Sequence, residues 1–259
     1  MKGKVSKNKF LKVVLPALLV VAIICQAVGF QAVLAKGNVA TTSSDSISNL
    51  TDQQLQALTN PILQSYKADS SHKVWKMTDD SRLAVLANQT NIENARLQEV
   101  VKLVNSEFVE KEIISSPLAM VYAQEKDVSY GDILIDIDQT SSITSSSNSK
   151  EAYKITIGEN GVRLTGASEN AIMHGLRTIQ NLIITNDGLV YGEIVDYPNV
   201  AERRVHVDCA RKYISKDWFI RQIREMSYMK MNALQIHFSE NMGFRIECET
   251  DPSIVSDQY

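Results

Sequence analysis

Apolar and polar positions follow different patterns in four successive parts of the chain. The first part is dominated by one long uncharged run. Five lysines precede this run, which extends from Val13 to Ala35 and ends in the small-residue pattern VLA. A basic start, a long apolar run and small residues at its end are typical of an export signal. The run is also long enough to cross a bilayer. We therefore predict a signal peptide or membrane anchor at residues 1–35, and a secreted or cell-surface protein.

The second part, residues 36–71, carries little regular pattern. TTSSDSISN is polar and has few apolar residues, which is typical of a flexible spacer. The following TDQQLQALTNPILQSY has some apolar spacing, but Pro61 interrupts it. We predict a linker that contains one short helical segment.

The third part, residues 72–199, begins with strand and helix patterns. Residues 74–76 and 82–87 are separated by MTDDS, whose polar residues favour a turn, so they predict a hairpin. NIENARLQEVVKLVNSEFVEK places its apolar residues on one broad face, which predicts an amphipathic helix. GDILIDID, residues 131–138, predicts a strand with one buried face, and the serine-rich QTSSITSSSNS after it predicts a loop.

The same part ends with a second hairpin and a second long helix. Gly158 and Gly161 lie on either side of a two-residue turn between EAYKITIG and GVRLTGA, where positive φ at the glycines favours a tight hairpin. Ser168 is a predicted N-cap, and apolar residues at helical spacing follow it. Residues 72–199 therefore predict an α+β domain in which two helices cover a mostly antiparallel sheet.

The fourth part, residues 200–259, changes to a strand, helix, strand pattern. RRVHVDCA has a strand pattern, Ser215 is the predicted N-cap of a helix, and ALQIHFS is the second strand. The 29-residue spacing from Arg204 to Ala233 is typical of a parallel βαβ unit. Such a unit begins both a (β/α)8 barrel and a doubly wound sheet, and the pattern leaves both open. The lack of GxGxxG in the first turn disfavours a dinucleotide-binding protein.

Composition narrows the classes of partner. The 259 residues are 44% apolar and 22% charged, as in ordinary globular proteins, and the net charge is −3. A chain without a basic field is not expected to bind nucleic acid. The histidines and cysteines show no metal-ligand spacing, so we expect no metal and no cofactor. Cys209 and Cys248, the two cysteines outside the predicted leader, are too few for a disulfide framework.

Two motifs in the fourth part carry a resemblance. R-x-x-x-x-D-x-x-R comprises Arg203, Asp208 and Arg211, and HFSENMGFRIE follows about one βαβ unit later. In order and spacing they resemble the first two strands of the (β/α)8 barrel of glycoside hydrolase family 20, the β-N-acetylhexosaminidases and lacto-N-biosidases. EAYKITI, GENGVRLTGASENAIMHGLRTIQNLI and IVDYPNVAERR look like the small α+β domain that precedes this barrel in the family. The resemblance therefore implies an α+β domain followed by the first βαβ unit of a truncated barrel.

The resemblance also implies roles for three residues. The family's arginine at the position of Arg211 hydrogen-bonds hydroxyls of the terminal sugar, and Asp208 at the strand end is expected to orient it. Glu240 is expected to support the arginine, although SENMGFRIE departs here from the SDDQGWRIE of many members. The structural alternative is an arginine that only pairs with a carboxylate of the first or second strand.

The reaction implied by the resemblance is a retaining, substrate-assisted hydrolysis that removes terminal β-linked N-acetylhexosamine, or lacto-N-biose, from a glycan without a metal. The catalytic Asp-Glu pair of the family lies at the end of the fourth barrel strand, which is expected downstream of Tyr259. We therefore expect the N-terminal fragment of an exported glycosidase, with no catalytic residue of its own and no activity alone. The alternative is a non-catalytic carbohydrate-binding or scaffold module.

Overall fold

The computed structural model describes residues 47–138, 143, 149–241 and 243–256. All described residues belong to one compact unit. The predicted leader and most of the predicted serine-rich loop lie outside the described residues. Within the described ranges, every helix is too short or too polar to cross a membrane.

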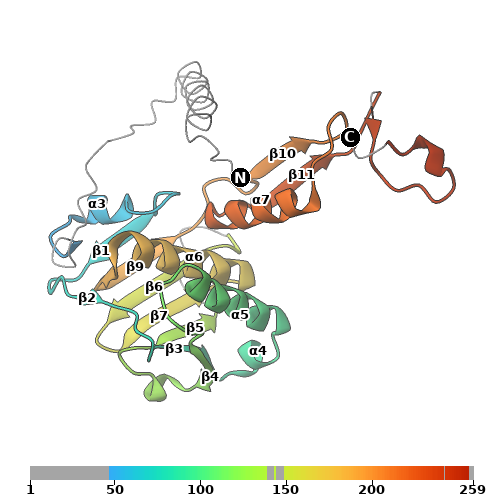
Figure 1. The fold of residues 1–259 in the computed structure, drawn as a ribbon. Helices are drawn as coiled ribbons and strands as arrows, with labels where there is room; N and C mark the ends of the chain where they lie inside the picture. Colours follow the sequence, from blue (N-terminus) through green and yellow to red (C-terminus); the bar gives the residue numbers. More distant parts are fainter. Residues whose placement is uncertain (1–46, 139–142, 144–148, 242, 257–259) are drawn as a thin grey trace, which may run out of the picture. The chain divides into compact units, whose positions relative to one another are not determined.

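Seven strands form one mixed sheet in the order β1-β9-β6-β7-β5-β3-β4 (Figure 1). In that order the strands are Ser65–Ala68, Gly192–Asp196, Tyr153–Gly158, Gly161–Gly166, Ile133–Ile137, Arg82–Leu86 and Ala119–Ala123. The pairs from β1 to β7 are antiparallel, and the pairs from β7 to β4 are parallel. The prediction of a mostly antiparallel sheet is therefore wrong. A helical crossover joins β3 to β4, and such a connection returns the chain in the same direction.

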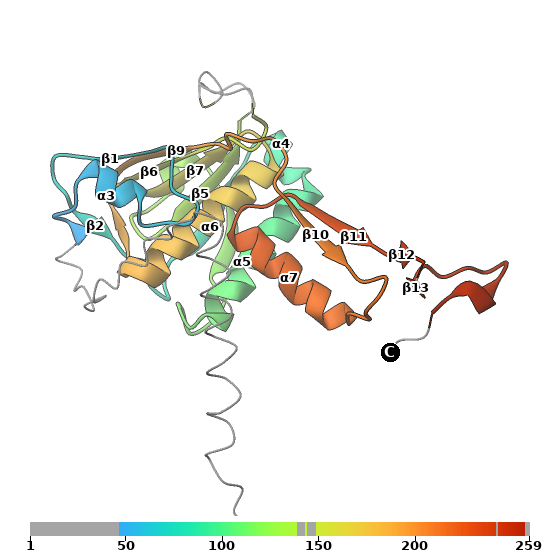
Figure 2. The same cartoon turned by 90° about the horizontal axis from the view of Figure 1, so that it is seen from above.

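Two long helices, α5 (Ala95–Glu110) and α6 (Glu169–Asn186), cover one face of this sheet (Figures 1 and 2). α6 begins at the predicted N-cap Ser168, whose Oγ accepts a hydrogen bond from the amide of Ala171 at 3.3 Å. Gly175 lets α6 approach the sheet closely, because a Cβ there would lie 2.3 Å from Cδ1 of Leu164. The main core fills the space between helices and sheet, and it includes Leu97, Val101, Val104, Phe108, Ile133, Ile155, Leu164, Ile172, Leu176 and Ile179.

Strand β5 is buried on both faces, whereas the sequence predicts only one buried face. Its three isoleucines join the main core as expected. Leu134, on the other face, packs with Ala84 and Ala123 in a second apolar cluster, against which Val128 also packs. Asp136 is 6% exposed there, and its buried carboxylate accepts a hydrogen bond from the side chain of Asn91 at 2.9 Å.

The first predicted hairpin does not form. β2 (Val74–Trp75) pairs with β8 (Leu189–Val190), while residues 82–86 pair with β4 and β5. Trp75 is fully buried, and its Nε1 donates a hydrogen bond to the carbonyl of Tyr130 at 2.6 Å. This burial fixes β2 beside β8 and away from the following strand.

The second predicted hairpin is confirmed by the antiparallel pairing of β6 and β7, in which Gly158 lies opposite Gly161. Positive φ is confined to Gly161 of the two, at 87°. A Cβ at Gly161 would lie 2.5 Å from the carbonyl oxygen of Asp132, so the turn needs glycine there for space as well as conformation.

The described part of the predicted linker belongs to the folded domain. The expected short helix is α3 (Asp52–Gln56), but the strand β1 that follows was not expected. Tyr66 of β1 is 1% exposed, and its hydroxyl donates to the carbonyl of Val190 at 2.8 Å. Leu55 and Leu63 also join the main core. The segment packs because these few apolar side chains find partners far along the chain.

The predicted strand, helix, strand unit is confirmed: β10 (Arg204–Asp208) runs parallel to β11 (Ala233–His237) with α7 (Lys216–Tyr228) between them. The Ser215 Oγ caps α7 by accepting from the amide of Trp218 at 3.3 Å. This pair forms a sheet of its own. The remaining short elements are α4 (Gln89–Ile92), β12 (Ser239–Glu240), β13 (Gly243–Phe244) and the 3-10 helices Glu125–Asp127 and Pro252–Ile254.

Candidate functional site

The carboxyl ends of β10 and β11 lie at the same edge, because the two strands are parallel and Asp208 pairs in register with His237. Side chains alternate along β10, with the even-numbered residues more exposed than Val205 and Val207. Polar residues that follow the two strands can therefore meet at this edge.

Arg211 and Glu240 form a two-pronged ion pair at this edge. Nε of Arg211 donates to Oε2 of Glu240 at 2.5 Å, and Nη2 donates to Oε1. The hydrogen bond and the attraction of the carboxylate raise the pKa of Arg211, while the same hydrogen bond lowers the pKa of Glu240. The Arg211 side chain is still 66% exposed, so the pair presents its remaining N–H groups to solvent.

The three predicted site residues line one open hollow of about 520 Å³, which we call the strand-end hollow. Its lining consists of His206, Asp208, Arg211, His237, Ser239, Glu240 and Asn241. The two histidine rings lie 6.1 Å apart between their centroids. Sequence reasoning placed the arginine and the two acids here and missed the histidines, whose positions on the same strand face were readable from the alternation.

Glu240 is the direct partner of Arg211, and Asp208 is not. Oδ1 of Asp208 accepts a hydrogen bond from the amide of Ala210 at 3.0 Å, which shapes the turn after β10. Asp208 acts on Arg211 only through a weaker electrostatic attraction. The orienting role expected of Asp208 stays a prediction, as do the roles of Arg211 and Glu240 toward a sugar.

The hairpin that carries Glu240 is tied to the end of β10. Nε of Arg245 donates to the carbonyl of Cys209 at 2.7 Å, and its amide donates to the carbonyl of Phe238 at 2.9 Å. A Cβ at Gly243 would lie 2.1 Å from the carbonyl oxygen of Ala210, so this close approach requires glycine. Arg245 is a supporting residue that the sequence analysis quoted without assigning it a role.

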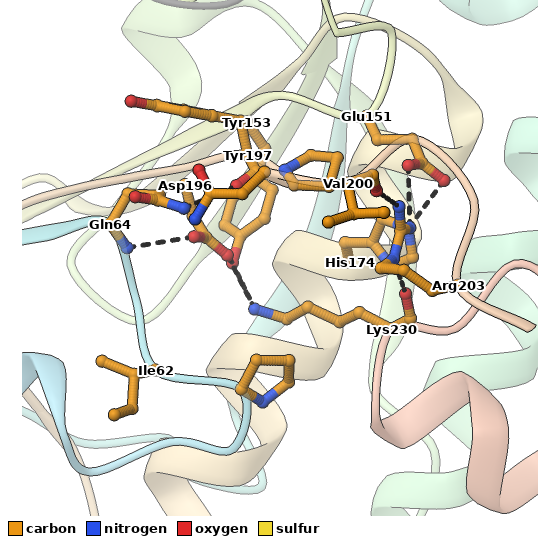
Figure 3. A pocket seen from close by; sticks show the side chains of 13 residues that line it. Ile62, Gln64, Glu151, Tyr153, His174, Asp196, Tyr197, Val200, Arg203 and Lys230 are labelled. Atoms are coloured by element: carbon orange, nitrogen blue, oxygen red, sulfur yellow. Dashed lines mark hydrogen bonds and ion pairs between the residues drawn. The ribbon is translucent and has the colours of Figure 1, made fainter.

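A second polar site, which we call the junction pocket, lies where the α+β part meets the βαβ unit (Figure 3). Its volume is about 260 Å³, and Ile62, Tyr153, Asp196, Val200, Arg203 and Lys230 are among its lining residues. Nη2 of Arg203 donates to Oε2 of Glu151 at 2.8 Å, and its Nε donates to the carbonyl of Lys230 at 2.8 Å. Arg203, which shares a sequence motif with Arg211, therefore holds the junction at the other end of the strand.

Lys230 and Asp196 are the two buried charges of the junction pocket that pair with each other. Nζ of Lys230 donates to Oδ2 of Asp196 and to the hydroxyl of Tyr153, both at 2.8 Å (Figure 3). Burial lowers the pKa of Lys230, against the attraction of Asp196. Burial opposes ionisation of Glu151 as well, but hydrogen bonds from His174 and Arg203 lower its pKa to about 2. Sequence reasoning did not identify this pocket, although Asp196 and Arg203 lie in the quoted motif IVDYPNVAERR.

Nothing in the described ranges brings three His, Cys, Asp or Glu side chains together as a metal ion would require. The expectation that the protein needs no metal stays a prediction.

Comparison with known proteins gives two adjoining matches. Residues 60–197 match glycosyl hydrolase family 20, domain 2, and residues 202–258 match the catalytic domain of the same family. The first match covers more than half of the chain.

Curated relatives agree with these matches. Beta-hexosaminidase B of Pseudoalteromonas piscicida is 30% identical over 95 residues, which is 36% of this chain and 12% of the relative. N,N'-diacetylchitobiase of Vibrio harveyi is 29% identical over 105 residues, which is 40% of this chain and 12% of the relative. The matched part spans far less than two thirds of each relative.

Solved structures show the same fold. The chitobiase of Flavobacterium johnsoniae has a TM-score of 0.63 at 19% identity, over 79% of this chain and 30% of that protein. The GH20 beta-N-acetylhexosaminidase of Streptomyces coelicolor A3(2) has a TM-score of 0.60 at 19% identity, over 79% of this chain and 39% of that protein. The chain therefore belongs to glycosyl hydrolase family 20, in which residues 60–197 match domain 2 and residues 202–258 match the catalytic domain.

Proposed function

We propose that this chain forms part of an exported glycosidase that removes terminal β-linked N-acetylhexosamine, or lacto-N-biose, from glycans. Family membership supports a glycoside hydrolase that acts on a glycan. The observation that carries the proposal is the fork of Arg211 on Glu240 in the strand-end hollow. Enzymes with parallel β/α barrels place their working residues at this end of the strands.

Arg211 binds the terminal sugar in this proposal. A guanidinium has five N–H donors in a fixed plane, and Glu240 accepts from two of its nitrogens. The donors that remain point away from the carboxylate, because the group is planar. Such fixed donors match two neighbouring hydroxyl oxygens of one sugar ring better than a single point charge, such as a lysine ammonium, would. Glu240 contributes by holding the plane of the fork.

Hydrolysis proceeds with help from the substrate in this proposal. The oxygen of the 2-acetamido group attacks the anomeric carbon, and the glycosidic C–O bond breaks as a glutamic acid protonates the leaving oxygen. A neighbouring aspartate stabilises the oxazolinium ion. Water then attacks the anomeric carbon while the glutamate takes its proton, and the bond between that carbon and the acetamido oxygen breaks, so the acetamido group is restored and the configuration is retained. We assign this Asp-Glu pair to a later barrel strand, outside the described residues.

The test uses a polypeptide in which the remaining strands of a family 20 barrel follow these residues, so that β10 and β11 are the first two strands of a whole barrel. We expect it to hydrolyse a chromogenic β-N-acetylglucosaminide, and we expect Arg211→Lys to lower kcat/KM by about 100-fold, because lysine keeps the charge and loses the fork. Arg204→Lys is the matched control, since Arg204 lies at the other end of the same strand and pairs with Glu202. Full activity in Arg211→Lys, or none in the parent polypeptide, would contradict the proposal.

Export is proposed from the lysine-rich, uncharged N-terminal run. Expression with and without residues 1–35, followed by fractionation, tests it. Equal retention of both forms inside the cell would contradict export.

A further inference from the structure

We propose that the junction pocket binds one neutral sugar ring, as a second carbohydrate site separate from the strand-end hollow. The choice of a sugar over other neutral ring compounds rests on the proposed function, because a glycan substrate brings sugar residues to the protein. The pocket itself is argued from its charge, its rim, its size and its hydrogen-bonding groups.

The charges of the junction pocket compensate one another. Lys230 pairs with Asp196 at 2.8 Å, and Arg203 pairs with Glu151 at 2.8 Å. Two cations and two anions thus leave no net charge for an ionic ligand to neutralise. A charged ligand would lose its hydration on entering the pocket and would find no unpaired opposite charge there. A neutral ligand therefore fits best.

The rim of the junction pocket is apolar and open. Ile62 is 66% exposed and Val200 is 60% exposed, and both line the pocket together with Pro61 and Pro198 (Figure 3). Large apolar side chains gathered around a hollow are typical of ligand sites, because the ligand covers them. A pyranose ring offers C–H groups on its faces to such a rim and hydroxyls at its edge.

Polar groups of the pocket keep hydrogen-bonding capacity. Lys230 is 7% exposed and its ammonium has three N–H groups, of which the bonds to Asp196 and Tyr153 use two. Gln64 donates from Nε2 to the carbonyl of Tyr197 at 3.1 Å, which leaves its amide oxygen as an acceptor. A pocket that offers both a hydrogen-bond donor and an acceptor suits hydroxyl groups, because a hydroxyl can donate and accept.

Size and position complete the argument. A volume of about 260 Å³ corresponds to roughly nine water molecules at about 30 Å³ each, which is room for one pyranose with its substituents. β10 separates the junction pocket from Arg211, and a strand of this length spans about 17 Å. A sugar in the pocket therefore leaves the strand-end hollow free for another residue of the glycan or for another chain.

The experiment is a saturation-transfer NMR titration of the whole chain with N-acetylglucosamine, with glucuronate as the charged probe. The double variant Ile62→Ala/Val200→Ala removes the apolar rim at two exposed positions, where folding should be little affected. Ile184→Ala, at a 49% exposed apolar residue of α6, is the matched control. Arg211→Ala separates this site from the strand-end hollow.

We expect the parent chain to bind N-acetylglucosamine more tightly than glucuronate, and the double variant to bind it about tenfold more weakly. Ile184→Ala should bind like the parent, and Arg211→Ala, which removes the sugar-binding group of the strand-end hollow, should keep the binding that depends on Ile62 and Val200. An unchanged affinity in the double variant, a complete loss of binding in Arg211→Ala, tighter binding of glucuronate or no binding by the parent would overturn the proposal. None of these outcomes depends on hydrolysis, so the proposed catalytic function can fail or hold independently.

Discussion

Lys230 and Asp196 form an ion pair that joins the seven-stranded sheet to the βαβ unit, with Nζ and Oδ2 2.8 Å apart and both side chains 9% exposed. Asp196 ends β9, and Lys230 follows α7. The hydroxyl of Tyr153 accepts from Lys230 and donates to Asp196 at 2.7 Å. Since both charges have left water, each depends on the other for compensation.

Removal of the lysine charge should therefore be costly. We expect Lys230→Met to lower the free energy of unfolding by about 3–5 kcal/mol, because Asp196 is left buried and unpaired. Lys76→Met is the matched control, since Lys76 and Asp187 form a pair that is 43% and 75% exposed, and it should cost at most about 1 kcal/mol. Urea denaturation measures both, and equal losses would contradict the assignment.

Glu151 should make the chain sensitive to acid. Its pKa falls from 4.5 to about 2 on folding, so its stabilising contribution is complete above pH 4.5 and is lost as the pH falls toward 2. The side chain is 13% exposed, and the contribution is about 3 kcal/mol. We expect Glu151→Gln to lose less stability than the parent between pH 5 and pH 2.5 in urea denaturation. Glu159→Gln, at a 68% exposed carboxylate, should follow the parent.

Gly175 should tolerate no side chain. A Cβ would lie 2.3 Å from Cδ1 of Leu164, so Gly175→Ala must push α6 away from β7 at a cost of about 1–3 kcal/mol. Gly158→Ala is the control, because nothing lies within 4 Å of a Cβ at that position. Thermal denaturation compares the two. A Gly175→Ala variant as stable as the parent would show that the helix is free to move.

Glu240 should act on the sugar through Arg211. In the polypeptide with a whole barrel, we expect Glu240→Gln to raise KM about tenfold with a smaller change in kcat, because the amide accepts at one atom only and the fork loses its fixed plane. Glu202→Gln, which changes the exposed partner of Arg204, should leave KM unchanged. A fall in kcat at constant KM would instead assign Glu240 to the chemical step.

Local features of the fold could be predicted from the sequence because their signals are local. The caps at Ser168 and Ser215, the turn at Gly161 and the parallel unit around α7 depend on residues close in sequence. The meeting of Arg211 and Glu240 was also predictable, since parallel strands bring their carboxyl ends to one edge whatever else surrounds them.

Strand partners could not be predicted in the same way. Val74–Trp75 has the composition of a hairpin strand, yet it pairs with residues 189–190, more than a hundred positions away. The pairing of this strand depends on the space in the core that Trp75 fills, and a short sequence pattern does not indicate that space. The same holds for the bond of Arg203 to Glu151, which was invisible until the sheet and the βαβ unit were placed together.

The two ends of β10 have different roles. Arg203 and Lys230 fasten its beginning to domain 2, and Arg211 lies just beyond its end. Mutations that change the loops around Arg211 should therefore leave the contacts of Arg203 and Lys230 intact. Residues around Arg211 can thus change over evolutionary time while the contacts at the beginning of β10 stay under separate selection.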